Sequence, residues 1–319
     1  MFAAVLASCS QAPNGLDPTR SSIIVTSPAH PALTYYGMVH GEGANSPGIW
    51  VMDADGSHQT PVQVGPPAGV QFGSPSWSPS GASICFTQGG MGVFPDTIKA
   101  FDVVTLNSAG APVGSNLRTI FGTSDPSASL AQPCWSSTAA GGKIAFVQTG
   151  LTIRGQTTST LCVVPQNGGK PVNVLTAKGP LELDFPTWSP DDSRLAVVRA
   201  NLPTEAMIMI YNTSTWQCVD SIPLVGGVLG LEWSRAGMNT LAFGMRTVPN
   251  DPYFLYTCDP ITGAAPVTDS VRCYWPTWAP DNSSVMYWQF GVGMLNSSPF
   301  KPITTVVSPY CNTVVKWKR

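Results

Sequence analysis

Short apolar segments alternate along the chain with segments rich in Gly, Pro, Ser and Asp. Typical apolar segments are Ile84-Cys85-Phe86 and Leu161-Cys162-Val163. The 319 residues include 31 Gly and 30 Pro, so turns are frequent, and no apolar stretch reaches the roughly 18 residues that suggest a membrane span. Charged residues make up 11% of the chain, against about 25% on average, whereas exposed helix faces usually carry many charges. The pattern therefore predicts an all-β protein of many short strands.

One pattern recurs five times around a tryptophan. A strand ends at the Trp, a turn such as Ser-Pro-Asp follows, and a second apolar strand comes next. The five tryptophans are Trp77, Trp135, Trp188, Trp233 and Trp278. Their spacings are 58, 53, 45 and 45 residues, and a period of about 40–50 residues with strand-like units is typical of a β-propeller. We expect the large rings to be structural and to fill the gaps between neighbouring sheets.

The repeat also resembles a known family. Pro-x-Trp-Ser-Pro-Asp with its apolar strand, together with Ile-Trp-Val-Met-Asp-Ala-Asp-Gly at residues 49–56, is similar to the repeat of TolB-type propellers. The resemblance covers about residues 22–319. It implies a six-bladed β-propeller of four-stranded antiparallel blades, which we assign to residues 23–319. TolB itself carries a separate α/β domain before its propeller, for which we expect no counterpart here, so TolB's own role is not transferred.

The sixth unit is degenerate and lacks the Trp. It lies at residues 22–64, and its second and third strands are expected at residues 33–39 and 49–52. The chain regains strands at residues 303–307 and 313–317. How the ring is closed is left open by the sequence.

The first residues indicate a membrane anchor. Residues 2–8 are apolar or small, and Leu6-Ala7-Ser8-Cys9 resembles a bacterial lipobox. We expect residues 1–9 to be a truncated lipoprotein signal with lipid on Cys9, and residues 10–22 to be a flexible tether. The protein would then be periplasmic or on the cell surface; Ser10, in place of Asp, favours the outer membrane of a Gram-negative bacterium. The alternatives are a start assigned too late or an ordinary apolar N-terminus.

The other cysteines predict no metal site. Seven remain besides Cys9, an odd number, and none forms a C-x-x-C pair. Several lie within apolar strand patterns, which favours buried free thiols there. The seven are Cys85, Cys134, Cys162, Cys218, Cys258, Cys273 and Cys311.

A search for catalytic signatures is negative. The sequence contains no G-x-S-x-G, H-E-x-x-H, P-loop or G-x-G-x-x-G motif. Its three histidines, His30, His40 and His58, lie close in sequence, but their loop and turn settings disfavour a metal role. Net charge is −2, and the only basic cluster is at the C-terminus, so nucleic-acid binding is not expected. We predict no cofactor and no metal, and a monomer.

Two sets of residues are expected at one face of the propeller. Loops between second and third strands are irregular, and such loops on a rigid scaffold often carry function. They are predicted at residues 40–48, 88–96, 149–159, 199–206, 245–252 and 291–302, and they carry Arg154, Arg199, Arg246, Phe94 and Phe300. Six positions before each repeat Trp, at the expected start of the innermost strand, lie Gln71, Ser129, Glu182, Gly227 and Arg272.

These positions define a candidate binding face around the axial channel. Asp184 should point the same way as Glu182 by strand alternation. The candidate residues are Gln71, Glu182, Asp184, Arg199, Arg246 and Arg272. A merely solvated rim is the competing interpretation. The functional prediction is a non-catalytic, envelope-associated propeller that binds a protein, peptide or small ligand at this face. The alternatives are an enzyme, such as a metal-dependent polysaccharide lyase or the gating domain of a peptidase, and a purely structural surface protein.

Overall fold

The computed structural model describes twelve segments of the chain. They are residues 33–38, 47–53, 60–64, 70–90, 94–105, 112–153, 156–201, 205–262, 266–289, 292–297, 302–306 and 316–317. The predicted signal, the tether, Cys9 and the three histidines lie outside them, as do Arg154, Phe300 and Cys311.

The described strands form six four-stranded antiparallel sheets, which we call A to F. Sheet A has the order β24 (Lys316–Trp317), β1 (Leu33–Met38), β2 (Pro47–Met52) and β3 (Thr60–Val64). Sheet B has β4 (Gln71–Trp77), β5 (Ser83–Gly90), β6 (Phe94–Thr105) and β7 (Pro112–Gly122). Sheet C has β8 (Ser129–Trp135), β9 (Lys143–Ile153), β10 (Gln156–Pro165) and β11 (Val172–Lys178).

The remaining three sheets repeat this order. Sheet D has β12 (Glu182–Trp188), β13 (Arg194–Asn201), β14 (Glu205–Asn212) and β15 (Cys218–Val225). Sheet E has β16 (Gly227–Trp233), β17 (Leu241–Arg246), β18 (Phe254–Cys258) and β19 (Val267–Arg272). Sheet F has β20 (Tyr274–Trp278), β21 (Ser284–Gln289), β22 (Val292–Ser297) and β23 (Pro302–Val306).

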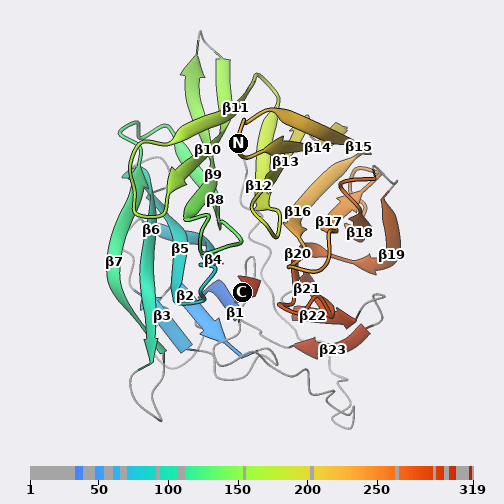
Figure 1. The fold of residues 1–319 in the computed structure, drawn as a ribbon, viewed down its shortest axis with the longest axis horizontal. Helices are drawn as coiled ribbons and strands as arrows, with labels where there is room; N and C mark the ends of the chain where they lie inside the picture. Colours follow the sequence, from blue (N-terminus) through green and yellow to red (C-terminus); the bar gives the residue numbers. More distant parts are fainter. Residues whose placement is uncertain are drawn as a thin grey trace.

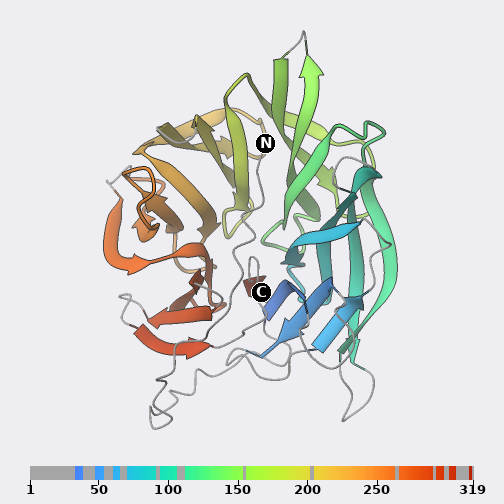
Figure 2. The ribbon, with the colours of Figure 1, turned by 180° about the vertical axis from the view of Figure 1, so that it is seen from behind.

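The sheets stand around a central axis, with the first strand of each sheet nearest the centre (Figures 1 and 2). These inner strands contact one another in sequence, and β24 contacts both β4 and β20. β24 pairs with β1, Leu33 lying opposite Trp317, so a strand from the end of the chain completes the first sheet and closes the ring. The predicted all-β propeller of four-stranded antiparallel sheets is confirmed.

Three of the predicted loops are wrong in extent. The range 291–302 contains β22, and the ranges 88–96 and 149–159 are largely strand. In sheet C, β9 and β10 stay paired from Lys143 opposite Pro165 to Ile153 opposite Gln156, and the hairpin projects beyond the ring in Figure 1. Its outer half is rich in Thr, whose branched side chain suits a strand without the apolar alternation that signals one.

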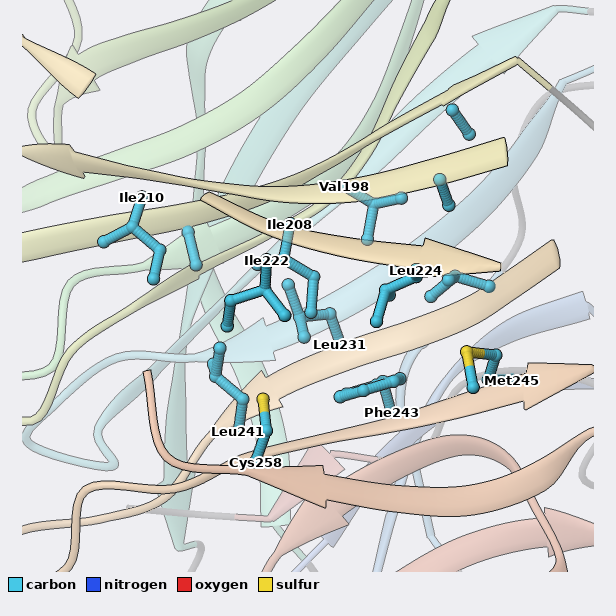
Figure 3. Packing of buried hydrophobic residues seen from close by; sticks show 14 of the residues in the cluster. Val198, Ile208, Ile210, Ile222, Leu224, Leu231, Leu241, Phe243, Met245 and Cys258 are labelled. Carbon is cyan, nitrogen blue, oxygen red and sulfur yellow. The ribbon is translucent and has the colours of Figure 1, made fainter. Parts of the chain in front are cut away.

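The core lies between the sheets, in clusters that join neighbouring blades. Figure 3 shows one of them: Val198, Ile208 and Ile222 of sheet D face Leu231, Phe243 and Met245 of sheet E. Every repeat Trp is buried with 1–2% exposure and belongs to the cluster shared with the preceding sheet. Trp188, for example, donates its indole Nε1–H to the carbonyl oxygen of Cys134 in sheet C, at 3.0 Å.

The turn after Trp188 ties sheet D to sheet C. In sheet D, the Ser189 hydroxyl accepts the N–H of Arg194 at 2.9 Å, and Asp191 Oδ1 accepts the N–H of Ser193 at 3.0 Å. Asp192 has a φ of 59°, a conformation that Asp tolerates better than most residues, and its carboxylate accepts the N–H groups of Ser137 and Thr138 in sheet C. The Ser-Pro-Asp signature therefore fixes its own hairpin, and the Asp192 that follows it joins the neighbouring blade.

Candidate binding site at the channel mouth

The inner strands all begin at the face opposite these turns. In the pairing register Gln71 lies opposite Gly89, Glu182 opposite Ala200, and Gly227 opposite Arg246. The ends of the second strands therefore lie beside the starts of the inner strands. We call this face of the ring the channel mouth. Four of the predicted residues in sheets B and D, Gln71, Glu182, Asp184 and Arg199, lie toward it, and Arg246 ends β17 there.

Two of the residues that lie six positions before a repeat Trp differ from the expected arrangement. β20 has five residues where the other Trp strands have seven, so six positions before Trp278 falls on Arg272, the last residue of β19. Arg272 thus lies opposite Phe254 on the outermost strand of sheet E. Ser129 does begin β8, but its hydroxyl donates to Asp96 Oδ2 of sheet B at 3.1 Å, so it joins two blades.

A β-bulge interrupts every inner strand that carries the Trp. Three positions before each Trp the backbone φ is positive, and the pairing register shifts at the same point. These residues are Ser74 (47°), Gln132 (54°), Phe185 (55°), Gly230 (76°) and Trp275 (48°). At four of the five sites a proline follows: Pro75, Pro133, Pro186 and Pro276. Proline lacks an N–H, so it fits a bulge on a strand edge that has no neighbour toward the axis.

The bulges line a cavity on the axis. The space between these residues is about 630 Å³, a volume that includes open solvent. All five bulge residues and all four prolines lie on its wall, with Lys316 of the closing strand. The wall is thus built from proline and aromatic rings with a small number of polar side chains, the composition usual for ligand pockets.

On the sheet D side a carboxylate with a raised pKa is hydrogen-bonded to the wall residue Gln132. Asp184 Oδ1 accepts the Nε2–H of Gln132 at 3.1 Å, and Gln132 Oε1 accepts the backbone N–H of Phe185 at 2.5 Å. Burial and the nearby carboxylate of Glu182 raise the pKa of Asp184 from 3.8 to about 7, although the Gln132 hydrogen bond opposes the shift. The Asp184 carboxylate beside the wall therefore changes charge near neutral pH.

On the sheet E side the wall carries a second carboxylate, which the sequence analysis missed. The Glu232 side chain is 4% exposed, and its Oε1 lies 2.6 Å from Arg235 Nη2, while Oε2 pairs with Lys316 Nζ. Thr277 also donates to Oε1, at 3.2 Å. Because Lys316 lies on β24, Glu232 ties the closing strand to sheet E. A sequence signal existed: the other repeats have Ser, Cys or Thr before the Trp, and only this one has a charge.

An arginine and three aromatic rings form a strip at the mouth between sheets E and F. Arg246 Cζ lies 4.9 Å from the centroid of Tyr253, Tyr253 lies 5.6 Å from Tyr274, and Tyr274 lies 6.5 Å from Trp275. Burial raises the pKa of Tyr253 above its usual value. We call Tyr253, Tyr274 and Trp275 the aromatic strip. No sequence pattern marked it, because its rings come from a loop and from the next blade.

Glycines let the chain pass beneath Arg246. Gly226 has a φ of 107°, and a Cβ there would lie 1.9 Å from the Arg246 carbonyl oxygen. At Gly227 a Cβ would lie 3.2 Å from Arg246 Nε and 3.3 Å from the Tyr253 hydroxyl oxygen. A side chain at Gly226 would collide with the backbone of Arg246, and one at Gly227 would crowd its guanidinium.

In the part of the chain that the structure describes, no group of three or more His, Cys, Asp or Glu could hold a metal ion, and no helix is long and apolar enough to cross a membrane. Of the six cysteines described there, Cys85 and Cys162 are buried, as expected. Burial raises the pKa of both Cys162 and Cys258 to about 12.

The sequence matches no model of a protein family and no curated protein. Solved structures do match in fold. TolB from Acinetobacter baumannii is 15% identical with a TM-score of 0.65, over 90% of this chain and 66% of that one. An oligogalacturonate lyase from Vibrio parahaemolyticus is 13% identical with a TM-score of 0.51, over 75% and 68%. An oligogalacturonate lyase in complex with manganese is 14% identical with a TM-score of 0.50, over 75% and 67%. The chain thus spans just under two thirds of the TolB chain, and identities this low bear on the fold alone.

Proposed function

We propose that this chain, a β-propeller of the TolB-like type, is a binding protein that holds an extended peptide segment of a partner at the channel mouth. The observation that carries the proposal is the cavity on the axis, whose wall is made by five bulge residues and four prolines. Bulges on strand edges re-aim side chains, and here all five occur at the same level of the ring. The blades gain nothing in pairing from them, since each bulge shifts the register of its own sheet.

The chemistry of the mouth suits a peptide. A strand-edge wall offers backbone groups to an extended chain, while pockets between them take side chains. Apolar rings of Pro186, Trp275 and their counterparts provide contact area, and Asp184 and Gln132 provide a few polar contacts. The wall is rigid because five of the inner strands are anchored by a buried Trp, which limits the entropy lost on binding.

We place the protein in the cell envelope, anchored through Cys9. The lipobox-like Leu-Ala-Ser-Cys segment supports this, and so does the fold shared with TolB. Labelling cells with a fatty-acid probe tests it. Wild type should carry label and Cys9→Ala should not; equal labelling of both would refute the anchor.

A pull-down tests the binding function. The purified protein is used to recover partners from envelope extract, and the affinity for the recovered protein is then measured for two double variants. Glu182→Ala with Arg199→Ala removes one charge of each sign at the mouth. Lys170→Ala with Asp220→Ala makes the same change on turns and outer strands and serves as control. The mouth variant should bind at least several-fold more weakly while the control binds like wild type. Unchanged affinity of the mouth variant, shown to be folded, would place the site elsewhere.

The alternative function is that of a propeller-fold lyase. It rests on the fold shared with oligogalacturonate lyases, one of them bound to manganese. Metal analysis of the purified protein, followed by an assay for cleavage of oligogalacturonate, separates the two. Stoichiometric metal together with cleavage would favour the enzyme over the binding protein.

A further inference from the structure

Arg246 has an unused binding capacity. Its guanidinium lies over the Tyr253 ring, 4.9 Å from the centroid, and it forms no ion pair with any carboxylate among the described residues. Its Nε is buried and has no hydrogen-bond partner in that part of the chain. A buried donor left without an acceptor costs free energy, and guanidinium donors match the two oxygens of a carboxylate. An incoming carboxylate would satisfy a group that the fold leaves unsatisfied.

The aromatic strip leads from Arg246 into the cavity. Tyr253 lies under the guanidinium, Tyr274 follows at 5.6 Å, and Trp275 lines the cavity wall. All three rings are partly exposed, so their faces and edges offer apolar contact area. A ligand whose carboxylate binds Arg246 would therefore continue over apolar rings toward the axis.

The neighbouring wall has the opposite charge and helps to decide the ligand class. β12 and β16 are adjacent inner strands, so Glu182 and Asp184 share the mouth with Arg246. An acidic oligosaccharide would bring only negative charge toward these carboxylates. A peptide can bring a carboxylate to Arg246, apolar side chains to the strip, and a basic group to Glu182 and Asp184. The charge pattern favours the peptide.

We propose that Arg246, supported by the Tyr253 ring, is the carboxylate receptor of the channel mouth and selects a peptide that carries an acidic residue next to apolar residues. This inference rests on the proposed function, because it names the chemistry of the segment that the mouth holds. Arg246 supplies the charged contact, and the aromatic strip holds the residues beside it.

A randomised peptide library tests the selection. Heptapeptides with amidated C-termini are selected on the wild-type protein, so that any carboxylate in a selected peptide belongs to Asp or Glu. We expect enrichment of an acidic residue flanked by apolar or aromatic residues. Replacing that residue by Asn or Gln in a selected peptide should weaken binding roughly 10- to 100-fold, as expected for loss of a charge-assisted bidentate contact.

Variants of the protein link the selection to Arg246. Arg246→Gln should lower the affinity for the acidic peptide by the same roughly 10- to 100-fold. It should bind the peptide in which Asn or Gln replaces the acidic residue as tightly as wild type does. Arg246→Lys keeps the charge without the planar fork and should fall between them. Lys170→Gln removes one positive charge from an exposed turn between β10 and β11 and should leave the affinity unchanged. Thermal melts establish that each variant is folded.

The outcomes separate this inference from the function on which it rests. If no peptide is enriched and a short oligogalacturonide binds with dependence on Arg246, both the peptide function and this inference are overturned. If peptides are enriched and lose affinity on Glu182→Ala with Arg199→Ala, but show no acidic preference or bind Arg246→Gln equally well, the function stands and the inference is wrong.

Discussion

Sheets D and E each place a carboxylate on or beside the channel wall, and the two have very different surroundings. Glu232 of sheet E is held by Arg235, Lys316 and Thr277. Asp184 of sheet D accepts one hydrogen bond from Gln132, has the carboxylate of Glu182 nearby, and has a pKa raised to about 7. A buried charge is tolerated when it is paired and hydrogen-bonded, as Glu232 is, and tends to take up a proton when it is not.

The difference separates a structural carboxylate from one available to a ligand. Glu232 lies directly before its Trp and joins the closing strand to the ring. Asp184 lies nearer the mouth, and nothing cationic among the described residues contacts it. We infer that the ends of the inner strands, where the Trp residues lie, hold the ring together. The bulges and the strand starts beyond them, toward the mouth, are available for binding.

The largest loss of stability is expected when a repeat Trp is replaced. Trp188→Ala removes a side chain that is 2% exposed and packed between sheets C and D, and such truncations typically cost about 3–5 kcal/mol of the free energy of unfolding. Urea denaturation measures the loss. If the variant unfolds like wild type but no longer binds the partner, Trp188 belongs to the binding site and is not a purely structural residue.

A somewhat smaller loss is expected from Glu232→Gln. The substitution removes the carboxylate that pairs with Arg235 and Lys316. Breaking a buried ion pair typically lowers the free energy of unfolding by about 3–5 kcal/mol. The loss should be smaller here because the Lys316 side chain is 25% exposed. We expect about 2–4 kcal/mol by urea denaturation. Lys316→Gln should cost less, and the double variant less than the sum of the two single losses. Additive losses would mean that Glu232 does not act through β24.

The smallest predicted effect, that of Asp184→Asn, is a gain in stability. Between about pH 4 and pH 7, native Asp184 keeps a proton that the unfolded chain releases, so its contribution to stability falls as pH rises through this window and is lowest above pH 7. Asp184→Asn keeps the acceptor for Gln132 without the charge. It should therefore stabilise the protein at pH 8 by on the order of 1–3 kcal/mol.

Thermal melts across pH show whether this holds. The advantage of Asp184→Asn should shrink steadily as the pH is lowered toward 4, while Glu232→Gln should be destabilised throughout. If Asp184→Asn were less stable than wild type at pH 8, Asp184 would have a cationic partner after all, and its contrast with Glu232 would disappear.

The repeat was predictable from sequence because its signal is local. Trp, Ser-Pro-Asp and the apolar strand recur in order, and each has a local physical cause, such as the Asp191 side chain that bonds its own turn. Even the degenerate first unit had its strands in the expected places, at β1 and β2. Ring closure by β24 was left open, because pairing Leu33 with Trp317 joins two distant parts of the chain.

The site was less predictable because its parts are brought together by the fold. A residue before proline normally prefers extended backbone with negative φ, so nothing local predicted positive φ at Ser74, Gln132 or Trp275. The aromatic strip combines the loop after β17 with the start of β20. Counting back from Trp278 assumed inner strands of equal length, and the short β20 moved Arg272 to the neighbouring sheet.

Hydrogen–deuterium exchange with and without a selected heptapeptide shows which face of the propeller the ligand protects. We predict slower exchange at residues 182–185, 227–230 and 246–254 and around 272–275, with no change in the turns at residues 136–142, 189–193 and 279–283. Protection confined to those turns, or to the outermost strands β7, β11 and β15, would contradict this prediction.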